Sequence, residues 1–498
     1  MLNMFNTSVE VSESGIDTAV LPLGSLEPKG AHLPLGFDFL LAERFSLDFC
    51  RGKAVYLLPP WPYSSAMEAF GFHGTAVLSQ QNLWDVIGDL ASVLARHRFK
   101  RLIIIDMSNY NWIVKHRVRE LNLDDEVVQA VWVNPKQFAL ESADKSLLPD
   151  YGGGAVETSI GLHLMKDLVK LPTSDFAPSV PREYIDYRGL KTLSSSGLWG
   201  KPSKATEKLG AAFYQTMMEK TRAYVDYALG LFDGGRPIES DESEEIFWPE
   251  GSTPGVAGSG VDWTNTLHEI SHSPTDMAIL ATGAIEQHSP SLPLGTDHFQ
   301  AVELSRRVAQ EFKAYLLPSL PVVTSWGHIR FRGTATLRAM TVRRVLTDIA
   351  ESVRVAGFRK MAIINVHGGN WVVKPTIIEF NQAHPDFTLV ANADILAYRG
   401  QAPVEHLHAD EGEASFVRAF HPKAFKADKV VDFSPNCTAS AFDLVGIGGV
   451  TPQGVWGYPS KATPEAGLAD MEERVADTTE HIRKTIADLQ GHYSARLK

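Results

Sequence analysis

The sequence predicts an α/β fold that is built twice along one chain, each copy having a largely parallel sheet. Three observations support this prediction. A long motif occurs twice at a nearly constant spacing. Short apolar runs alternate with segments of helical periodicity. The chain has 498 residues, 44% of them hydrophobic and 21% charged, which suits two ordinary globular cores.

The repeated motif covers residues 21–38 and 280–297. Glu27 and Glu286 are 259 positions apart, and so are Asp38 and Asp297, so no residue is inserted between the two acids. Three further segments repeat with offsets of 256 to 259, namely 106–112 with 365–371, 157–159 with 413–415, and 197–206 with 454–463. A period this long indicates a duplicated domain rather than a solenoid of short repeats.

Predicted strands and helices alternate through the second half. Apolar runs predict strands at 277–281, 315–317, 360–366 and 387–392, and helical spacing predicts helices at 299–312, 342–356 and from 413 to 420. The first half repeats the layout, for example with a strand at 101–106. Because ligand sites in parallel sheets lie beyond the carboxyl ends of the strands, residues distant in sequence are expected to meet there.

The two copies are expected to be separate domains at residues 1–232 and 263–498, joined by a linker at 233–262. The linker is acidic and then rich in Gly, Pro and Ser, which is typical of an exposed connection. Its apolar residues 246–248 can still attach it to a domain surface.

Composition excludes several classes of function. A net charge of −12 without a basic tract argues against nucleic acid and anionic membranes as partners. No apolar run is long enough to cross a bilayer, and the N-terminus lacks the pattern of a signal peptide. Cys50 and Cys437 fall in different halves and in no metal-binding spacing, so we expect buried thiols in a reducing cytoplasm.

Carboxylates and imidazoles gather at predicted strand ends and loops of the second half. The set comprises Glu286, His288, Asp297, His367 and Glu413. Taken singly, each fits an ordinary solvated or hydrogen-bonded residue. Together they suit one or two divalent ions, Zn²⁺, Mn²⁺ or Fe²⁺, and a carboxylate such as Asp297 can bridge two ions through its two oxygens.

A second polar cluster contains His408 and Glu411, shortly before Glu413. It is open to two interpretations, a catalytic pair or a polar helix N-terminus at which acids are favoured by the helix dipole.

At these residues the chain resembles the creatininase family of metal-dependent amidohydrolases. The resemblance rests on Glu286-Gln-His288 with Pro293-Leu-Gly-Thr-Asp297, His328-x-x-Phe-Arg-Gly-Thr334, Asn365-Val-His-Gly-Gly-Asn370, His408-Ala-x-Glu-x-Glu413, and Gly454-x-Trp-Gly-x-Pro-Ser-x-Ala-Thr463. It implies layered α/β/α domains that bind metal through Glu286, His288, Asp297 and His367, with Glu413 as a further ligand. Creatininase itself has a metal-binding Glu where this chain has Gly369.

The resemblance also implies hydrolysis of a C–N amide bond by metal-activated water in the second half. Cyclic amides, formamides and related small molecules are the expected substrates, and His408 or Glu411 the expected proton carrier. The alternatives are a peptidase acting on a modified peptide and a non-catalytic metal-binding scaffold. Arg330 or Arg332 meets an anionic substrate or is simply exposed to solvent, two interpretations that the sequence leaves equally open.

The first half is expected to fold without a catalytic metal. Lys29 replaces His288, Ser108 replaces His367, and only carboxylates such as Glu157 are retained. A lysine ammonium between Glu27 and Asp38 can stand in for the lost cation, because unpaired buried carboxylates are costly. Since members of the family are typically oligomers of single domains, the fused pair is expected to be a pseudo-dimer that assembles into a homo-oligomer.

Overall fold

The computed structural model describes residues 1–123, 128–171, 173–182, 184–233, 247–248, 260–392, 406–437 and 439–496. Most of the predicted linker lies outside these ranges, so its limits remain a prediction. Within it, Phe247 and Trp248 are described, and both rings make edge contacts with Phe5, with centroids 5.3 and 5.6 Å away. The linker therefore touches the surface near the N-terminus, as its apolar residues predicted.

The first half contains a four-stranded sheet in the order β2-β1-β3-β4, in which every pairing is parallel. Its strands are β1 (Thr18–Leu23), β2 (Tyr56–Leu57), β3 (Arg101–Asp106) and β4 (Gln129–Val133). β1 and β3 are buried over their whole length, which explains why they are continuous apolar runs rather than alternating ones.

The second half repeats this arrangement with one further edge strand. Its order is β5-β7-β6-β8-β9, again entirely parallel. The strands are β5 (Val261–Asp262), β6 (Met277–Thr282), β7 (Tyr315–Leu316), β8 (Lys360–Asn365) and β9 (Thr388–Ala391). The α/β class with parallel sheets is therefore confirmed.

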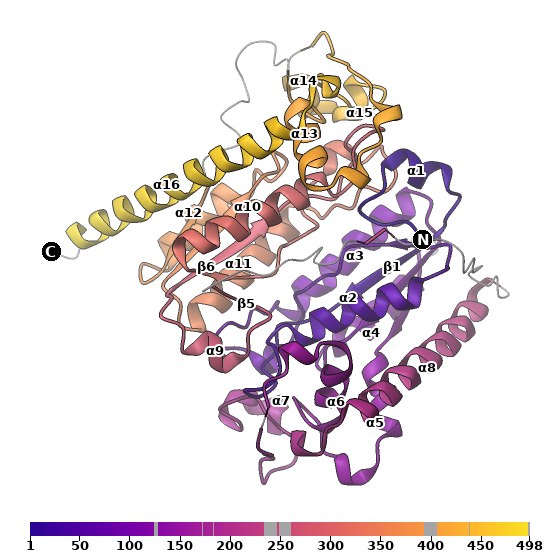
Figure 1. The fold of residues 1–498 in the computed structure, drawn as a ribbon, viewed down its shortest axis with the longest axis vertical. Helices are drawn as coiled ribbons and strands as arrows, with labels where there is room; N and C mark the ends of the chain where they lie inside the picture. Colours follow the sequence, from indigo (N-terminus) through magenta and orange to yellow (C-terminus); the bar gives the residue numbers. More distant parts are fainter. Residues whose placement is uncertain are drawn as a thin grey trace.

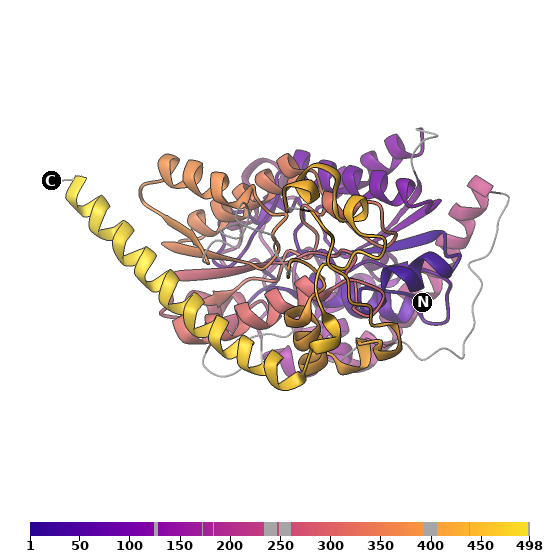
Figure 2. The ribbon, with the colours of Figure 1, turned by 90° about the horizontal axis from the view of Figure 1, so that it is seen from above.

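Helices cover both faces of each sheet (Figures 1 and 2). In the second half α10 and α16 lie on one face and α11 and α12 on the other, and Figure 2 shows the sheets between these layers. The helices of the first half are α1 (Ser8–Glu13), α2 (Phe37–Cys50), α3 (Gln80–Arg96), α4 (Trp112–Leu121), α5 (Pro135–Ser142), α6 (Ala155–Leu164), α7 (Tyr184–Arg188) and α8 (Glu207–Asp233). Those of the second half are α9 (Leu267–Ser271), α10 (Thr296–Phe312), α11 (Ala339–Val355), α12 (Val373–Ala383), α13 (Glu411–Phe420), α14 (Ala439–Val445), α15 (Ile447–Val450) and α16 (Pro464–Arg496).

The predicted elements of the second half are all present, and the helices begin earlier than the apolar periodicity indicated. The helix expected at 299–312 begins at Thr296, which places Asp297 in its first turn instead of in the preceding loop. The helix expected from 413 begins at Glu411, after Asp410 as N-cap. In both cases polar first-turn residues carry no hydrophobic signal, so the pattern begins only after them.

The two halves pack as the subunits of a symmetric dimer do. Tyr56 Oη donates to the carbonyl of Gly333 at 2.8 Å, and Tyr315 Oη donates to that of Gly74 at 2.9 Å. Both residues of the second bond are offset by 259 positions from their counterparts in the first. One apolar cluster contains side chains of both halves, so the halves share a core.

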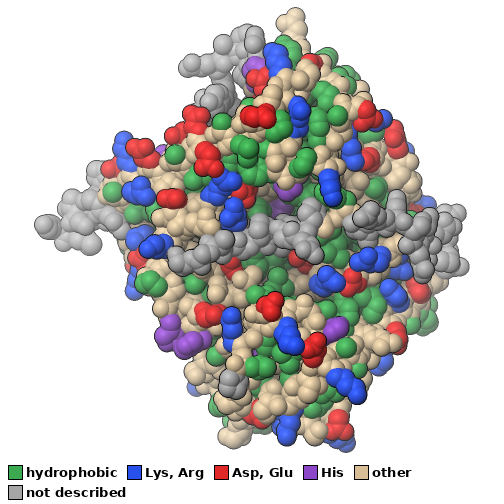
Figure 3. Space-filling view, viewed as in Figure 1, with side chains coloured by type: hydrophobic (Ala, Val, Ile, Leu, Met, Phe, Trp, Pro, Cys, Tyr) green, Lys and Arg blue, Asp and Glu red, His purple; other side chains and the backbone are tan. Residues whose placement is uncertain are grey.

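The surface shown in Figure 3 mixes basic and acidic side chains over both halves. Among the described residues, no helix is both long and apolar enough to span a membrane.

Candidate metal centre

The five predicted ligands come together beyond the carboxyl ends of β6 and β8. Glu286 and His288 lie in the loop after β6, and His367 lies directly after β8. Asp297 is in the first turn of α10 and Glu413 in the first turn of α13. The first four are buried, and the side chain of Glu413 is 21% exposed.

Asp297 is the centre of this cluster. Its Oδ1 lies 3.2 Å from His288 Nε2, and its Oδ2 lies 3.0 Å from His367 Nδ1. Two ligand triplets share it, Glu286–Asp297–His367 and His288–Asp297–Glu413, each with ligand atoms within 4.8 Å of one another. The two carboxylate oxygens thus face two different sets of ligands.

Glu286 lies among three imidazoles. Its Oε1 is 3.2 Å from His328 Nε2, its Oε2 is 3.3 Å from His367 Nε2, and His408 Nδ1 is 3.9 Å from Oε1. His328 is buried in η6 (Trp326–His328) and was not among the predicted site residues. Its presence in the His328-x-x-Phe-Arg-Gly-Thr334 motif was the signal that could have identified it.

Burial and charge perturb these groups strongly. Burial raises the pKa of Glu286 to about 7, although His367 opposes the shift. Burial alone would lower the pKa of His367, but Glu286 and Asp297 raise it to about 9. Burial likewise disfavours the charged form of His288, yet Asp297 and Glu413 raise its pKa well above the usual value. The carboxylates therefore draw positive charge onto the imidazoles beside them.

The donor set fits divalent metal. Glu286 Oε2 and Asp297 Oδ2 are buried and, among the described residues, have no partner with hydrogen-bond geometry, although His367 approaches both. Buried carboxylate oxygens without such partners are costly in a protein unless a cation satisfies them. Imidazole and carboxylate donors without cysteine match Zn²⁺, Mn²⁺ and Fe²⁺.

His408 borders the cluster and forms a third possible triplet with Glu286 and His288. Its Nε2 is 2.7 Å from the carbonyl of Gln287, so that nitrogen is the protonated donor and Nδ1 carries the lone pair. Burial, and then the charge of His288, lowers the pKa of His408 to about 4. At neutral pH the ring is therefore neutral.

Glu411 is less closely connected to the cluster. Its Oε2 lies 3.9 Å from His406 Nδ1, and its side chain is 41% exposed. It lies two residues before Glu413 on α13, and residues at that spacing do not share a helix face. The interpretation as a helix N-terminus also holds in part, because Asp410 Oδ1 accepts hydrogen bonds from the N–H groups of Gly412 and Glu413, 2.9 and 3.1 Å away.

The equivalent place in the first half holds two lysines. Lys29 Nζ lies 3.0 Å from both Asp38 Oδ2 and Glu157 Oε1, and 3.6 Å from Glu27 Oε2. Lys136 Nζ lies 2.6 Å from Asp38 Oδ1 and 2.8 Å from Glu157 Oε1. All these side chains are buried. Sequence comparison identified Lys29 but missed Lys136, which follows β4 in the first turn of α5.

Ser108 and the amide of Asn109 complete that arrangement. Ser108 Oγ donates to Glu27 Oε1 at 2.6 Å, and Asn109 Nδ2 donates to Glu157 Oε1 at 3.2 Å. The described residues of the first half contain no set of three or more metal-ligand groups of the kind found in the second.

The two arginines considered for an anionic substrate donate hydrogen bonds to residues outside the ligand cluster. Arg332 donates to the carbonyl of Ile16 and lies over the ring of Phe99, 4.6 Å from its centroid, so it joins the two halves. Arg330 is exposed and donates to the carbonyl of Gly448 at 3.3 Å.

Gly369 is held between two groups of the site. A Cβ at this position would lie 2.2 Å from His367 Nε2 and 2.5 Å from the carbonyl oxygen of Thr324. The loop therefore has no room for any side chain there, which agrees with the absence of a Glu ligand.

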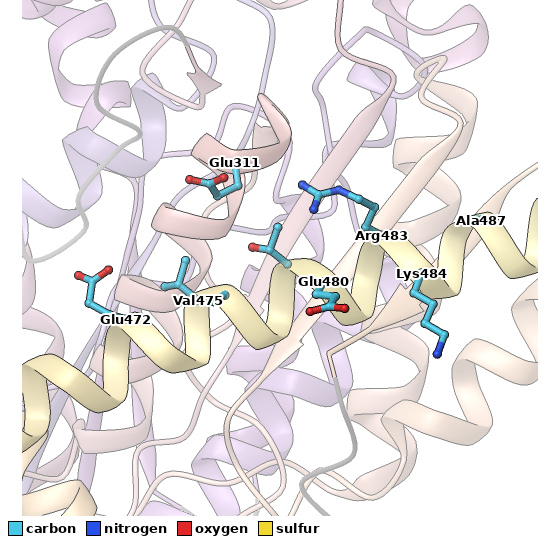
Figure 4. A pocket seen from close by; sticks show the side chains of 9 residues that line it. Glu311, Glu472, Val475, Glu480, Arg483, Lys484 and Ala487 are labelled. Atoms are coloured by element: carbon cyan, nitrogen blue, oxygen red, sulfur yellow. The ribbon is translucent and has the colours of Figure 1, made fainter.

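Two grooves lie outside the cluster. One, of about 790 Å³, runs along α16 and is lined by Glu311 and by residues including Glu472, Glu480 and Arg483 (Figure 4). It contains none of the clustered ligands. The other, of about 410 Å³, lies beside the His367 loop and includes Asn365 and Asn370 among mostly apolar residues of α12, β9 and α16.

Comparison with known proteins identifies relatives of both halves. The family model described as creatininase, creatinine amidohydrolase, matches residues 3–225 and 263–482. Relatives include a mycofactocin precursor peptide peptidase of Mycolicibacterium smegmatis, 25% identical over 46% of this chain and 92% of the relative. A 3-dehydro-scyllo-inosose hydrolase of Thermotoga maritima is 23% identical, over 44% and 79%. A creatinine amidohydrolase of Pseudomonas putida is 24% identical, over 41% and 88%.

Similar solved structures include a putative creatinine amidohydrolase of Bacteroides fragilis, 27% identical over 45% of this chain and 95% of the other, with a TM-score of 0.38. A manganese form of creatininase is 21% identical over 46% and 95%, with a TM-score of 0.38. A mutant creatininase described as Zn-Zn type is 23% identical over 42% and 90%, with a TM-score of 0.35.

Proposed function

The chain belongs to the creatininase family, and we propose that its second half is a metal-dependent amidohydrolase that cleaves a C–N bond in a small-molecule amide. The observation that carries the proposal is the position of Asp297, whose two oxygens face His288 and His367 at 3.2 and 3.0 Å. This geometry suits a carboxylate that bridges two ions.

In the proposed ligand set, Glu286, Asp297 and His367 would hold one divalent ion, and His288, Asp297 and Glu413 would hold a second. Zinc, manganese or iron would each fit these donors, and one or two ions per chain would satisfy the buried oxygens. When bound, such ions supply a water molecule whose pKa is lowered toward about 7 and polarise the substrate carbonyl.

We assign the proton transfer to His408 rather than to Glu411. The neutral His408 ring is fixed through Nε2 by the carbonyl of Gln287 and directs Nδ1 toward Glu286. Nδ1 accepts the proton of the attacking water and then delivers it to the nitrogen of the breaking C–N bond. Glu411 lies on another face of α13, is partly exposed and pairs with His406 instead of with the clustered ligands.

The candidate substrates belong to two classes. Cyclic amides and formamides are the primary candidates, because the relatives include a creatinine amidohydrolase and a formylamino-pyrimidine deformylase. A modified peptide is the second candidate, because a mycofactocin precursor peptide peptidase matches 92% of its own length to this chain.

The test is a turnover screen of lactams, formamides and short peptides with Mn²⁺, Zn²⁺ or Fe²⁺ added to the metal-free protein. We expect hydrolysis of at least one amide class in the presence of metal and none after chelation. A protein that binds metal but hydrolyses no amide or peptide would support the scaffold alternative instead.

Two variants test the proton carrier. His408→Ala is expected to reduce kcat by about 10²- to 10⁴-fold, the usual contribution of a positioned acid or base, while metal content is retained. Glu411→Gln is expected to stay close to wild type. Loss of metal in His408→Ala would make His408 a ligand, and full turnover by both variants would exclude both residues.

We further propose that the first half binds no catalytic metal and acts as a pseudoenzyme domain. Lys29 and Lys136 support this, because both ammonium groups already form ion pairs with Asp38 and Glu157, the counterparts of Asp297 and Glu413. Assembly of these pseudo-dimeric chains into a homo-oligomer is a prediction that light scattering of the purified protein tests.

A further inference from the structure

The loop that carries the proposed ligands is held from outside by the other half of the molecule. The N–H of Glu286 donates to the carbonyl of Leu294 at 2.9 Å. The N–H of Leu294 in turn donates to the carbonyl of Asn6, also at 2.9 Å. The next residue, Gly295, donates its N–H to the carbonyl of Met4 at 2.8 Å. Leu294 and Gly295 therefore join the ligand loop to the N-terminal arm of the first half.

This arm, defined as residues 3–6, has a fixed shape. Asn3 N–H donates to Asn6 Oδ1 at 2.9 Å, and Phe5 N–H donates to Asn3 Oδ1 at 2.9 Å. The ring of Phe5 stacks on Phe299 of α10, with centroids 4.5 Å apart and planes 17° from parallel. Phe299 is two residues after Asp297, so the arm contacts both ends of the segment that presents the bridging acid.

An equivalent arm, residues 262–265, runs from the second half to the first. The N–H of Leu35 donates to the carbonyl of Asn265 at 2.9 Å, and the N–H of Gly36 donates to the carbonyl of Trp263 at 2.8 Å. Asp262 N–H donates to Asn265 Oδ1 at 2.9 Å, as Asn3 does to Asn6. Each of these residues is offset by 259 positions from its counterpart. The halves thus exchange arms.

The helices that follow the two arms make additional matched contacts. Lys426 Nζ lies 3.1 Å from Glu10 Oε1 in the first turn of α1, and Lys170 Nζ lies 3.7 Å from Glu269 Oε1 in the first turn of α9. The exchange is therefore symmetric in structure, but only one of the two supported loops carries the histidines.

We propose that the N-terminal arm of the first half is a positioning element for the metal loop of the second half, with Asn6 as the residue that keeps the arm in shape. The inference rests on the proposed function in one respect, namely that the loop binds a divalent metal ion. Without the arm, the N–H groups of Leu294 and Gly295 lose their acceptors, and Glu286 and Asp297 lose the backbone frame that aligns them. The half that lacks a metal site would thus act on the metal centre without contacting it.

The exchange of arms supplies a matched pair of variants in the full chain. Asn6→Ala and Asn265→Ala remove the same side-chain acceptor from equivalent arms. Amide hydrogen exchange in the metal-free protein should become faster at Leu294 and Gly295 in Asn6→Ala, and at Leu35 and Gly36 in Asn265→Ala. This measurement does not depend on metal or on activity.

Metal affinity, measured by competition of Mn²⁺ with a chelator well below the unfolding temperature, is the second measurement. Asn6→Ala should weaken binding by about ten- to a hundredfold, the usual effect of losing a group that orients metal ligands. Asn265→Ala should leave the affinity unchanged, even if it lowers the Tm by a similar amount. Asn6→Asp keeps the oxygen acceptor for Asn3 N–H but places a second carboxylate beside Glu10, whose Oε2 accepts from Asn6 Nδ2 at 3.4 Å, so it should restore only part of the affinity.

Equal metal affinity in the two alanine variants would overturn the inference, and so would unchanged exchange at Leu294 and Gly295 in Asn6→Ala. If Asn6→Ala yields too little folded protein, Phe5→Leu removes the ring stack while keeping an apolar side chain, and unaltered Mn²⁺ affinity in that variant would overturn the inference as well. Failure of the wild-type chain to bind Mn²⁺ would instead refute the proposed function, while the exchange pattern would still report on the arms.

Discussion

The ammonium nitrogen of Lys29 lies 3.0 Å from Asp38 Oδ2, and both side chains are buried. In the second half His288 Nε2 lies 3.2 Å from Asp297 Oδ1, at the same position of the repeated motif. The lysine supplies an ammonium that belongs to the chain itself, whereas an imidazole that has lost its proton can bind a metal ion through the free ring nitrogen. The two halves therefore balance the same carboxylates in two different ways.

Replacement of Lys29 by Met is expected to destabilise the chain substantially. Removing one partner of a buried ionic cluster typically costs about 3–5 kcal/mol, because the remaining charges lose their compensation. Urea unfolding of the full chain at pH 7 measures this change in the free energy of unfolding. Lys100→Met, which removes an exposed lysine, is the control and should change little. An equal effect of both variants would contradict the proposed role of Lys29.

The same cluster predicts how stability depends on pH. Although burial would raise the pKa of Glu157, Lys136 and Lys29 hold it below the usual 4.5, so its contribution is present above that pH and is lost as pH falls. Burial would lower the pKa of Lys29, but Asp38 and Glu157 raise it well above 10.5, so its contribution is present below that pH and is lost as pH rises. We expect the contribution of Glu157 and Lys29 to be constant between these limits.

The free energy of unfolding of Lys29→Met should depend on pH differently from that of the wild type in mild acid. Burial raises the pKa of Asp38 to about 6 even with both lysines present, so this carboxyl can take up a proton when one lysine is absent. The difference in unfolding free energy between wild type and Lys29→Met should therefore narrow as pH falls from 7 through 6 to 5. Urea unfolding at each pH measures it, and a difference that widens in acid would refute the explanation.

Most of the fold could be predicted from the sequence, because its signals are hydrophobic. The buried strands β3 and β8 appear as continuous apolar runs, and the helix predicted at 342–356 corresponds to α11 with a shift at its start. The first turns of α10 and α13 were missed, since Asp297 and Glu411 are polar and add nothing to the apolar period. The arm contacts could not be predicted, because they are backbone hydrogen bonds between distant segments.

The proposed ligands could be predicted from residue types at predicted strand ends, from the family motifs and from comparison of the two halves. Glu286, His288, Asp297 and His367 stand out because the first half changes two of them to Lys29 and Ser108. Lys136 and His328 were missed for opposite reasons. Lys136 lies in no repeated motif, whereas His328 lies in one of the motifs shared with the family, but its distance of 3.2 Å from Glu286 depends on the fold.

Metal content should depend entirely on the second half. We expect wild-type chain to hold one or two divalent ions and Asp297→Asn to hold substantially fewer, because one neutral amide cannot bridge two ions as a carboxylate does. Metal analysis after dialysis gives the stoichiometry, and turnover should fall in parallel. The matched control is Asp38→Asn in the first half, which should leave the metal content unchanged. Reduced metal content in that control would refute a metal-free first half.

Gly369 tests whether the His367 loop tolerates any side chain. In Gly369→Ala the new Cβ would lie 2.5 Å from the carbonyl oxygen of Thr324, a backbone atom that cannot rotate away, and 2.2 Å from His367 Nε2. The loop must shift, and overpacking of this kind costs about 1–3 kcal/mol. Since His367 moves with the loop, we expect weaker metal binding and at least about a tenfold loss of kcat/KM, as when a group that orients a ligand is changed.

The control is Gly230→Ala in α8, where a Cβ meets nothing within 4 Å and a helix interior favours alanine. Titration of Mn²⁺ into both variants measures the difference, and wild-type affinity in Gly369→Ala would show that His367 does not depend on this close approach.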